Sequence, residues 1–213
     1  MTSDDDRAHV EMSELHWNSV YERHGTTGVS WYQSSPEMSL AISELLASSK
    51  DAAITDVGGG ASMLVPSLLG QGFTDLTVLD VASRALELSQ AQLGPDARRV
   101  HWLHQDLLLW APSRSYDLWH DRAVFHFLVA PASRRRYVDV LLDALALDGL
   151  LILGAFAPDG PARCSGRPVA RHDAAQLGAV LGSGFVLLDE RYEEHRTPNG
   201  AVQPFTRATF RRR

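Results

Sequence analysis

A short apolar segment of this chain runs directly into an acidic residue and three consecutive glycines. The apolar run covers 52–54, and residues 56–62 read DVGGGAS. Glycines let a backbone turn sharply and let a ligand approach the main chain without meeting a Cβ atom. A helical pattern follows from Met63 to Leu69. The segment therefore predicts a strand, a tight turn and a helix, which is the ligand-binding corner of many α/β folds.

The residues of this turn indicate a ligand without phosphate. A dinucleotide-binding loop reads G-x-G-x-x-G and holds a pyrophosphate at the helix N-terminus. Gly58 and Gly60 match the first two glycines, but Met63 occupies the third position. Asp56 would repel a phosphate and would suit a ligand with a positive group. Asp80 ends the next apolar run, about 20 residues on, where an acid can bind ribose hydroxyls.

S-adenosylmethionine fits these features, because it has an ammonium, a sulfonium and a ribose and no phosphate. Capping of strand ends is the alternative role for the two acids. The chain resembles the class I S-adenosylmethionine-dependent methyltransferases through DVGGGAS at 56–62, VLD at 78–80, Gln105-Asp106 and YDL at 116–118. The resemblance covers about 13–213.

The resemblance implies a Rossmann-like three-layer α/β sandwich. Its mostly parallel seven-stranded sheet would end in an antiparallel hairpin. It also implies S-adenosylmethionine as cofactor and S-adenosylhomocysteine as product. By this analogy Asp56, Gly58 and Gly60 line the methionine end of the cofactor, Asp80 binds the ribose, and Asp106, with Gln105 beside it, lies near the adenine.

Alternating strand and helix patterns independently predict a parallel sheet covered by helices. The expected strands are 52–57, 76–80, 99–103, 116–120 and 150–156, and the expected helices are 36–48, 61–70, 83–93, 132–146 and 173–182. Two further strand-like runs, 185–194 and 202–211, enclose a turn at 198–200 and predict an antiparallel hairpin. Ligands of such sheets bind beyond the carboxyl ends of the strands.

Composition favours one domain. The 213 residues are 45% hydrophobic, which is enough for a sizeable core. Residues 1–12 are polar and acidic and are predicted to be disordered, and 13–213 are predicted to be a single methyltransferase domain. Within it, 13–35 would form an N-terminal lid, with a helix capped by Ser13 and ended by Gly25.

Charge and apolar runs exclude several partners. The net charge of -6 argues against a nucleic-acid substrate, which needs a basic surface. No apolar run approaches the ~18 residues of a membrane span, and residues 1–6 lack the pattern of a signal peptide. We therefore expect a cytoplasmic protein with no membrane partner. The lone Cys164 excludes an internal disulfide and a cysteine-rich metal site.

The run 119–127 (WHDRAVFHF) concentrates polar and aromatic side chains after the fourth expected strand. Methyl transfer requires an aligned nucleophile and, for some acceptors, a base. His126 is the candidate base, with Asp121 to orient a histidine and His120 as the adjacent second histidine. A satisfied core histidine and an Asp121–Arg122 ion pair are the alternatives. Arg122 is a candidate for binding the substrate.

The same run is similar to the Trp-Asp-Arg stretch of thiopurine-type methyltransferases and of a branch of protein lysine methyltransferases. Two positions depart from that pattern. His120 stands between Trp119 and Asp121, and Ala123 replaces a glycine that those relatives often have.

Aromatic residues of the N-terminal segment suggest a lid over the cofactor. In similar methyltransferases this segment reaches the methionine portion of the cofactor, and Tyr21 and Trp31 are our candidates for that role. Aromatic faces also attract a sulfonium by cation–π contact, worth ~0.5–2 kcal/mol. Packing in the core is the alternative.

The long segment 157–172 is expected to contribute to the substrate site, because long loops in compact domains are often functional. Arg163 and Arg167 could bind an acidic substrate by paired hydrogen bonds. Cys164 is either a reactive thiol or an ordinary buried cysteine. The histidines lack a metal-binding spacing, so we expect no metal.

These observations predict a methyltransferase that acts on a small soluble nucleophile or carboxylate. A protein lysine methyltransferase and a catalytically silent cofactor-binding module are the alternatives. Met63 and Asp56 disfavour an NAD-dependent dehydrogenase. The oligomeric state is left open.

Overall fold

The chain folds as two units, and each is described by itself. The computed structural model describes residues 4–36, 41–42, 44–46 and 49–213, with side chains from Met12 onward. Close contacts divide it into the units 1–110 and 111–213. The single domain over 13–213 stays a prediction.

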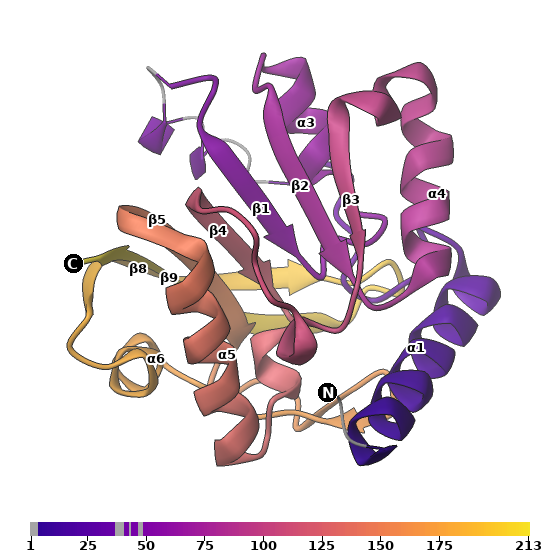
Figure 1. Cartoon of the computed structure of the whole chain (residues 1–213). Helices are drawn as coiled ribbons and strands as arrows, with labels where there is room; N and C mark the ends of the chain where they lie inside the picture. The colour runs from indigo at the N-terminus through magenta and orange to yellow at the C-terminus, as the bar shows by residue number, and fades with distance from the viewer. Residues whose placement is uncertain (1–3, 37–40, 43, 47–48) are drawn as a thin grey trace. The chain divides into compact units, whose positions relative to one another are not determined.

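The first unit is built on three parallel strands in the order β3-β2-β1. The strands β1 and β2 end at the same edge (Figure 1). Parallel pairing therefore brings the residues that follow each strand together. The elements of this unit are α1 (Asp4–His24), β1 (Ala53–Val57), α3 (Leu64–Gly70), β2 (Asp75–Asp80), α4 (Ser83–Leu93), η1 (Gly94–Arg99), β3 (Val100–His104) and η2 (Leu107–Leu109).

Helix α1 lies beside the start of α4 (Figure 1), and side-chain hydrogen bonds join the two helices. The Asn18 side-chain oxygen accepts a hydrogen bond from the backbone N–H of Arg84 at 3.0 Å. The Asn18 amide donates to Ser83 Oγ at 3.1 Å, and Ser83 Oγ donates to Glu14 at 3.2 Å. The first backbone donors of a helix lack partners within it, so Asn18 caps α4 from another helix.

The second unit contains four strands in the order β4-β5-β9-β8. The pair β4–β5 is parallel, and the pairs β5–β9 and β8–β9 are antiparallel. Buried side chains of α5 pack its core, among them Tyr137 and Leu141. The elements are β4 (Tyr116–Arg122), η3 (Phe125–Phe127), α5 (Pro131–Ala144), β5 (Leu145–Phe156), β6 (Arg163–Cys164), β7 (Arg167–Pro168), α6 (Ala174–Leu181), β8 (Phe185–Arg196) and β9 (Val202–Arg212).

The two units together supply the seven strands that the sequence predicts, and the predicted Rossmann-like α/β fold with a C-terminal antiparallel hairpin is confirmed. Helix α4 coincides with its predicted bounds, and α1 ends before Gly25 as expected. The predicted helix 36–48 lies largely outside the described residues.

Three local expectations need correction. Helix α1 begins at Asp4 rather than at Ser13, so residues 4–12 are helical instead of a disordered tail. Strand β5 begins at Leu145, five residues early, because α5 passes directly into it. The loop 157–172 contains a small hairpin, β6–β7, whose turn places Ser165 and Gly166 at positive φ.

Ala123, at the end of β4, has the left-handed backbone that favours glycine. Its φ is +75°, and its N–H donates to the Gly154 carbonyl at 2.8 Å. A left-handed conformation costs an L-residue about 1–2 kcal/mol. A glycine at this position would relieve the strain.

We predict that Ala123→Gly leaves the free energy of unfolding unchanged or raises it by up to ~1 kcal/mol, because relief of strain offsets the greater entropy of unfolded glycine. Urea denaturation measures the change. The matched control is Ala179→Gly on the exposed side of α6, which should lose ~0.5–1 kcal/mol. Equal losses in both variants would show that the Ala123 backbone carries no strain.

Candidate active site

Gly60 lies where the first unit leaves no room for a side chain. Its φ is +42°, and a Cβ atom would lie 2.7 Å from the Tyr21 hydroxyl and 2.9 Å from Asp80 Oδ2. Both distances are shorter than real Cβ contacts. The glycine backbone therefore lies against the buried carboxylate that ends β2.

Asp80 is a buried acid with one oxygen already engaged. Its Oδ1 accepts a hydrogen bond from the Ala82 backbone N–H at 2.7 Å. Burial, with the nearby charge of Asp56 adding to it, raises the pKa of Asp80 to about 6. A carboxylate in this position would be stabilised by additional donors, such as a pair of hydroxyl groups.

Asp56 is enclosed by the glycine turn. Ser62 Oγ donates a hydrogen bond to Asp56 Oδ2 at 3.3 Å. A Cβ atom on Gly59 would lie only 2.5 Å from the same oxygen, so the middle glycine is also required. Gly58, at φ +63°, donates its N–H to the Leu79 carbonyl of β2 at 2.7 Å. The turn thus packs directly on two acids.

The N-terminal aromatics pack beside this turn. Tyr21 is buried, and Trp31 Nε1 donates a hydrogen bond to its hydroxyl at 3.3 Å. The two rings meet edge to face, with centroids 5.9 Å apart. Burial and the charge of Asp80 raise the pKa of Tyr21, so it remains a neutral hydroxyl. Tyr21, Gly60 and Asp80 thus form one cluster.

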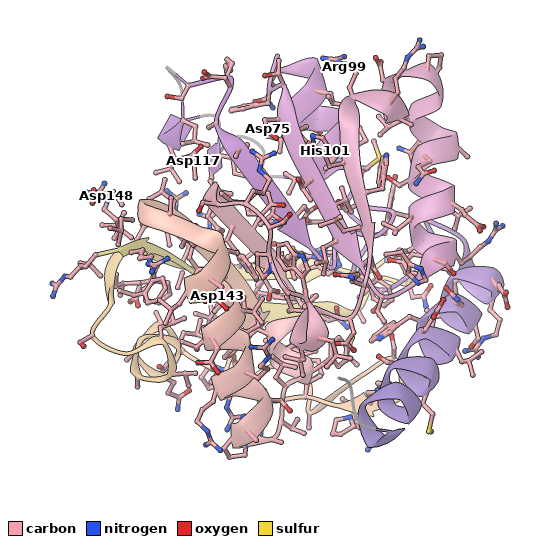
Figure 2. All side chains as sticks on the ribbon, in the orientation of Figure 1. Asp75, Arg99, His101, Asp117, Asp143 and Asp148 are labelled. Carbon is pink, nitrogen blue, oxygen red and sulfur yellow. The ribbon has the colours of Figure 1, made fainter. Side chains whose placement is uncertain are left out.

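Gln105 and Asp106 follow β3 at the same edge of the sheet. The Gln105 N–H donates to the Asp80 carbonyl at 3.1 Å, which places the end of β3 beside that of β2. Asp106 Oδ1 accepts from the Leu108 N–H at 2.7 Å and caps η2. Asp75 and His101, labelled in Figure 2, lie near the starts of β2 and β3, away from the ends where Asp80 and Gln105 lie.

In the second unit, His126 is fully buried among aromatic rings. Among the described residues, neither ring nitrogen has a hydrogen-bond partner. The rings of Phe127 and Phe156 lie 4.4 and 4.6 Å away between centroids. Burial, with Arg122 and His172 adding to it, lowers the pKa of His126 to about 3. The imidazole is therefore neutral at physiological pH.

Asp121 accepts hydrogen bonds from the backbone of the turn that carries His126, and it makes none with the imidazole nitrogens. Its Oδ1 accepts from the backbone N–H groups of Val124 and Phe125 at 2.9 and 3.3 Å. The Tyr137 hydroxyl donates to Oδ2 at 2.9 Å and accepts from Trp119 Nε1 at 3.0 Å. The carboxylate thus holds η3 in place. Among the described residues Asp121 makes no hydrogen bond with the His126 ring, and orientation of one histidine by Asp121 stays a prediction.

His120 and the arginines differ in their surroundings. His120 is buried on β4, close enough to lower the pKa of Asp121. Arg122 is also largely buried, whereas Arg163 is exposed and donates to the Gly166 carbonyl across its own hairpin. In the same hairpin Arg167 pairs with Cys164, which is buried. Of the three predicted substrate-binding arginines, Arg122 is the one whose charge acts on His126.

Within the described part of the chain, no group of three His, Cys, Asp or Glu residues is arranged to bind a metal ion. None of the described helices is both long enough and apolar enough to span a membrane.

Several residues of these clusters escaped sequence reasoning. They come from strands and loops far along the chain, and only Gly59 carried a local signal, as part of the glycine run. The missed residues are Gly59, Tyr137, Gly154, Phe156, His172, Glu193 and Phe205.

Neither a protein-family model nor a curated protein sequence matches the chain. Solved structures do match. The 1,6-didemethyltoxoflavin-N1-methyltransferase of Burkholderia thailandensis matches with a TM-score of 0.69 and 18% identity, over 100% of this chain and 91% of that protein. The magnesium protoporphyrin IX methyltransferase of Synechocystis matches with a TM-score of 0.70 and 15% identity, over 100% of this chain and 99% of that protein. The N-methyltransferase NodS of Bradyrhizobium japonicum matches with a TM-score of 0.68 and 20% identity, over 92% of this chain and 97% of that protein.

The chain has the fold of S-adenosylmethionine-dependent methyltransferases. All three structures are named as methyltransferases, and they hold S-adenosylmethionine or S-adenosylhomocysteine. Because their sequences are so little identical to this chain, the similarity supports a shared fold and nothing beyond it.

We predict that Gly60→Ala lowers the free energy of unfolding by ~1–3 kcal/mol, because the methyl group would meet the Tyr21 hydroxyl and Asp80 in addition to the strain of positive φ. Chemical denaturation gives the value. Gly72→Ala is the control, since Gly72 also has positive φ (+89°) but has nothing within 4 Å of a Cβ atom. Equal losses for the two variants would contradict the close packing of Gly60.

The pH dependence of stability tests the burial of Asp121. Burial raises its pKa to about 6, above the ~3.9 of an unfolded aspartate. The folded chain therefore binds this proton more tightly, and the resulting stabilisation is complete below about pH 4 and is lost as pH rises through 6. We expect the wild type to lose up to ~1.4 kcal/mol per pH unit in this window relative to Asp121→Asn.

Urea unfolding at several pH values measures this difference. Asp117→Asn, at an exposed position of the same strand (Figure 2), should keep the wild-type slope. A wild-type slope in Asp121→Asn would mean that Asp121 titrates as an exposed acid.

Proposed function

We propose that this chain is an S-adenosylmethionine-dependent methyltransferase that acts on a small molecule. One observation carries the proposal: the glycine turn after β1 lies against a buried carboxylate at the end of β2, with no room for a Cβ atom at Gly60. The fold shared with known methyltransferases supports it.

The residues of the first unit fit this cofactor. Asp80 would bind the ribose hydroxyls, which are the donors that a buried carboxylate favours. Asp56, Gly58 and Gly60 would line the methionine portion, with Tyr21 and Trp31 beside it. Gln105 and Asp106 would lie near the adenine. Two buried acids at this turn oppose a phosphate-bearing cofactor such as NAD.

When bound, the cofactor supplies a methyl group on a positively charged sulfur, which a nucleophile displaces. This chain's own task is to hold and align the acceptor. We assign that task to the second unit, with Arg122 as a binding residue and His126 as the residue that contacts the reacting group. Asp121 and Tyr137 position His126 through η3. Roles for His120, Arg163 and Arg167 stay predictions.

His126 would be a weak base by itself, because a pKa near 3 is far below the operating pH. A negative charge on the acceptor would raise this pKa and strengthen the base. The base role predicted for His126 therefore depends on the acceptor.

Small-molecule acceptors are supported by two structural neighbours, whose names include didemethyltoxoflavin and magnesium protoporphyrin IX. The run 119–122 supports placement near the thiopurine-type branch. A protein lysine as acceptor has no comparable support.

Calorimetric titration tests the proposal. S-adenosylmethionine and S-adenosylhomocysteine should bind, and NAD should not. Asp80→Asn should weaken the binding of S-adenosylhomocysteine at least ten-fold, or by ~1.4 kcal/mol, because charge-assisted hydrogen bonds to the ribose are lost.

Asp75→Asn is the matched control, since Asp75 lies at the other end of β2 (Figure 2). It should bind as the wild type does. Binding of NAD alone, or unchanged affinity in a folded Asp80→Asn, would overturn the cofactor assignment.

A further inference from the structure

His126 has hydrogen-bonding capacity that the described chain leaves unused. A neutral imidazole has one donor and one acceptor nitrogen, and neither has a partner here although the side chain is 0% exposed. An unsatisfied buried polar group destabilises the folded state. Such a group is retained where a ligand supplies the missing bond.

Arg122 extends across β5 toward the same rings. Its paired residue on β5 is Gly154, where a Cβ atom would lie 3.4 Å from Arg122 Cγ. The guanidinium carbon then lies 4.6 Å from the centre of the Phe205 ring, and Glu193 lies 3.9 Å from the guanidinium. The Arg122 side chain thus packs along Gly154, and its guanidinium lies over an aromatic ring.

The rings around His126 come from three elements of the second unit. Phe156 ends β5, Phe205 is its paired residue on β9, and Phe127 lies in η3. The centroids of Phe156 and Phe205 are 4.8 Å apart, and that of His126 lies 4.6 Å from Phe156 and 6.3 Å from Phe205. These buried rings pack on one another and on the imidazole and form an aromatic wall.

One buried cation, Arg122, acts on His126. Burial is the main cause of the lowered pKa of His126, and the charge of Arg122 adds to it. Glu193 pairs with Arg122 at 3.9 Å, so the cation has one acidic partner in the chain. A buried cation stabilises a nearby anion and repels a second cation.

From this juxtaposition we propose that Arg122 and His126 bind a small planar anion, an aromatic carboxylate or ionised phenol, as the methyl acceptor. Arg122 would supply paired donors to the anion, and His126 would hydrogen-bond it while Phe156 and Phe205 contact its ring. The inference rests on the proposed methyltransferase function and defines its substrate class. It disfavours a cationic lysine as acceptor.

Benzoate, benzamide and benzylamine are the probes, because they share a ring and differ in charge. They are titrated into the full chain by calorimetry, both alone and after saturation with S-adenosylhomocysteine. Benzoate should bind at least ten-fold more tightly than benzamide, and benzylamine should bind least. The imidazole NMR signals of His126 should shift with benzoate, and those of the exposed His24 should not.

Two arginine variants separate charge recognition from general damage. Arg122→Gln should bring the benzoate and benzamide affinities to within two-fold of each other. Arg135→Gln, at an exposed position of α5, should preserve the wild-type preference. If Arg122→Gln does not fold, Arg122→Lys should keep a weakened preference for benzoate.

The outcomes distinguish this inference from the proposed function. Equal or tighter binding of benzamide or benzylamine, or no binding of benzoate in either condition, overturns the acceptor class while S-adenosylhomocysteine still binds. Failure of S-adenosylhomocysteine to bind overturns the proposed function. Binding of benzoate without a shift of His126 overturns the assigned site.

Discussion

Parallel pairing of β1, β2 and β3 is the constraint on which the candidate cofactor cluster depends. Each strand ends at the same edge, so residues about 25 positions apart in sequence become neighbours. The Gly58 N–H bonds to the Leu79 carbonyl, and the Gln105 N–H bonds to the Asp80 carbonyl. Because these backbone bonds set the register, the side chain of Asp80 meets the glycine turn without any direct sequence signal for that contact.

The second unit places buried charge in two different ways. Asp121 is satisfied by backbone N–H groups and by Tyr137, so its carboxylate organises the chain around η3. The side chain of Arg122, the next residue, lies on the other face of the strand and extends past Gly154 to the Phe205 ring. One strand thus supplies an acid that organises the backbone and, in the adjacent position, a cation that lies over an aromatic ring. The strained Ala123 follows them, where the chain leaves β4 and turns toward His126.

Much of the fold was predictable because its signals are local. Apolar runs ending in acids or glycines located β1 and β2, and the 3.6-residue pattern of α4 gave its bounds. Errors arose where local composition conflicts with structure. The acidic residues of 4–12 suggested disorder, yet they form the first turns of α1. The short hairpin β6–β7 was missed because two-residue strands carry no period.

By itself the sequence determined the α/β class, the strand–glycine–helix corner and the candidacy of Asp56, Gly60, Asp80 and His126, because each depends on residue type and spacing along one segment. Only the tertiary structure decided what these residues contact. It assigned Asp121 to η3 and Tyr137 rather than to His126, and it separated Arg122 from the exposed Arg163. The physical reason is that burial and hydrogen-bond partners depend on strand register and on side chains that lie far apart in sequence.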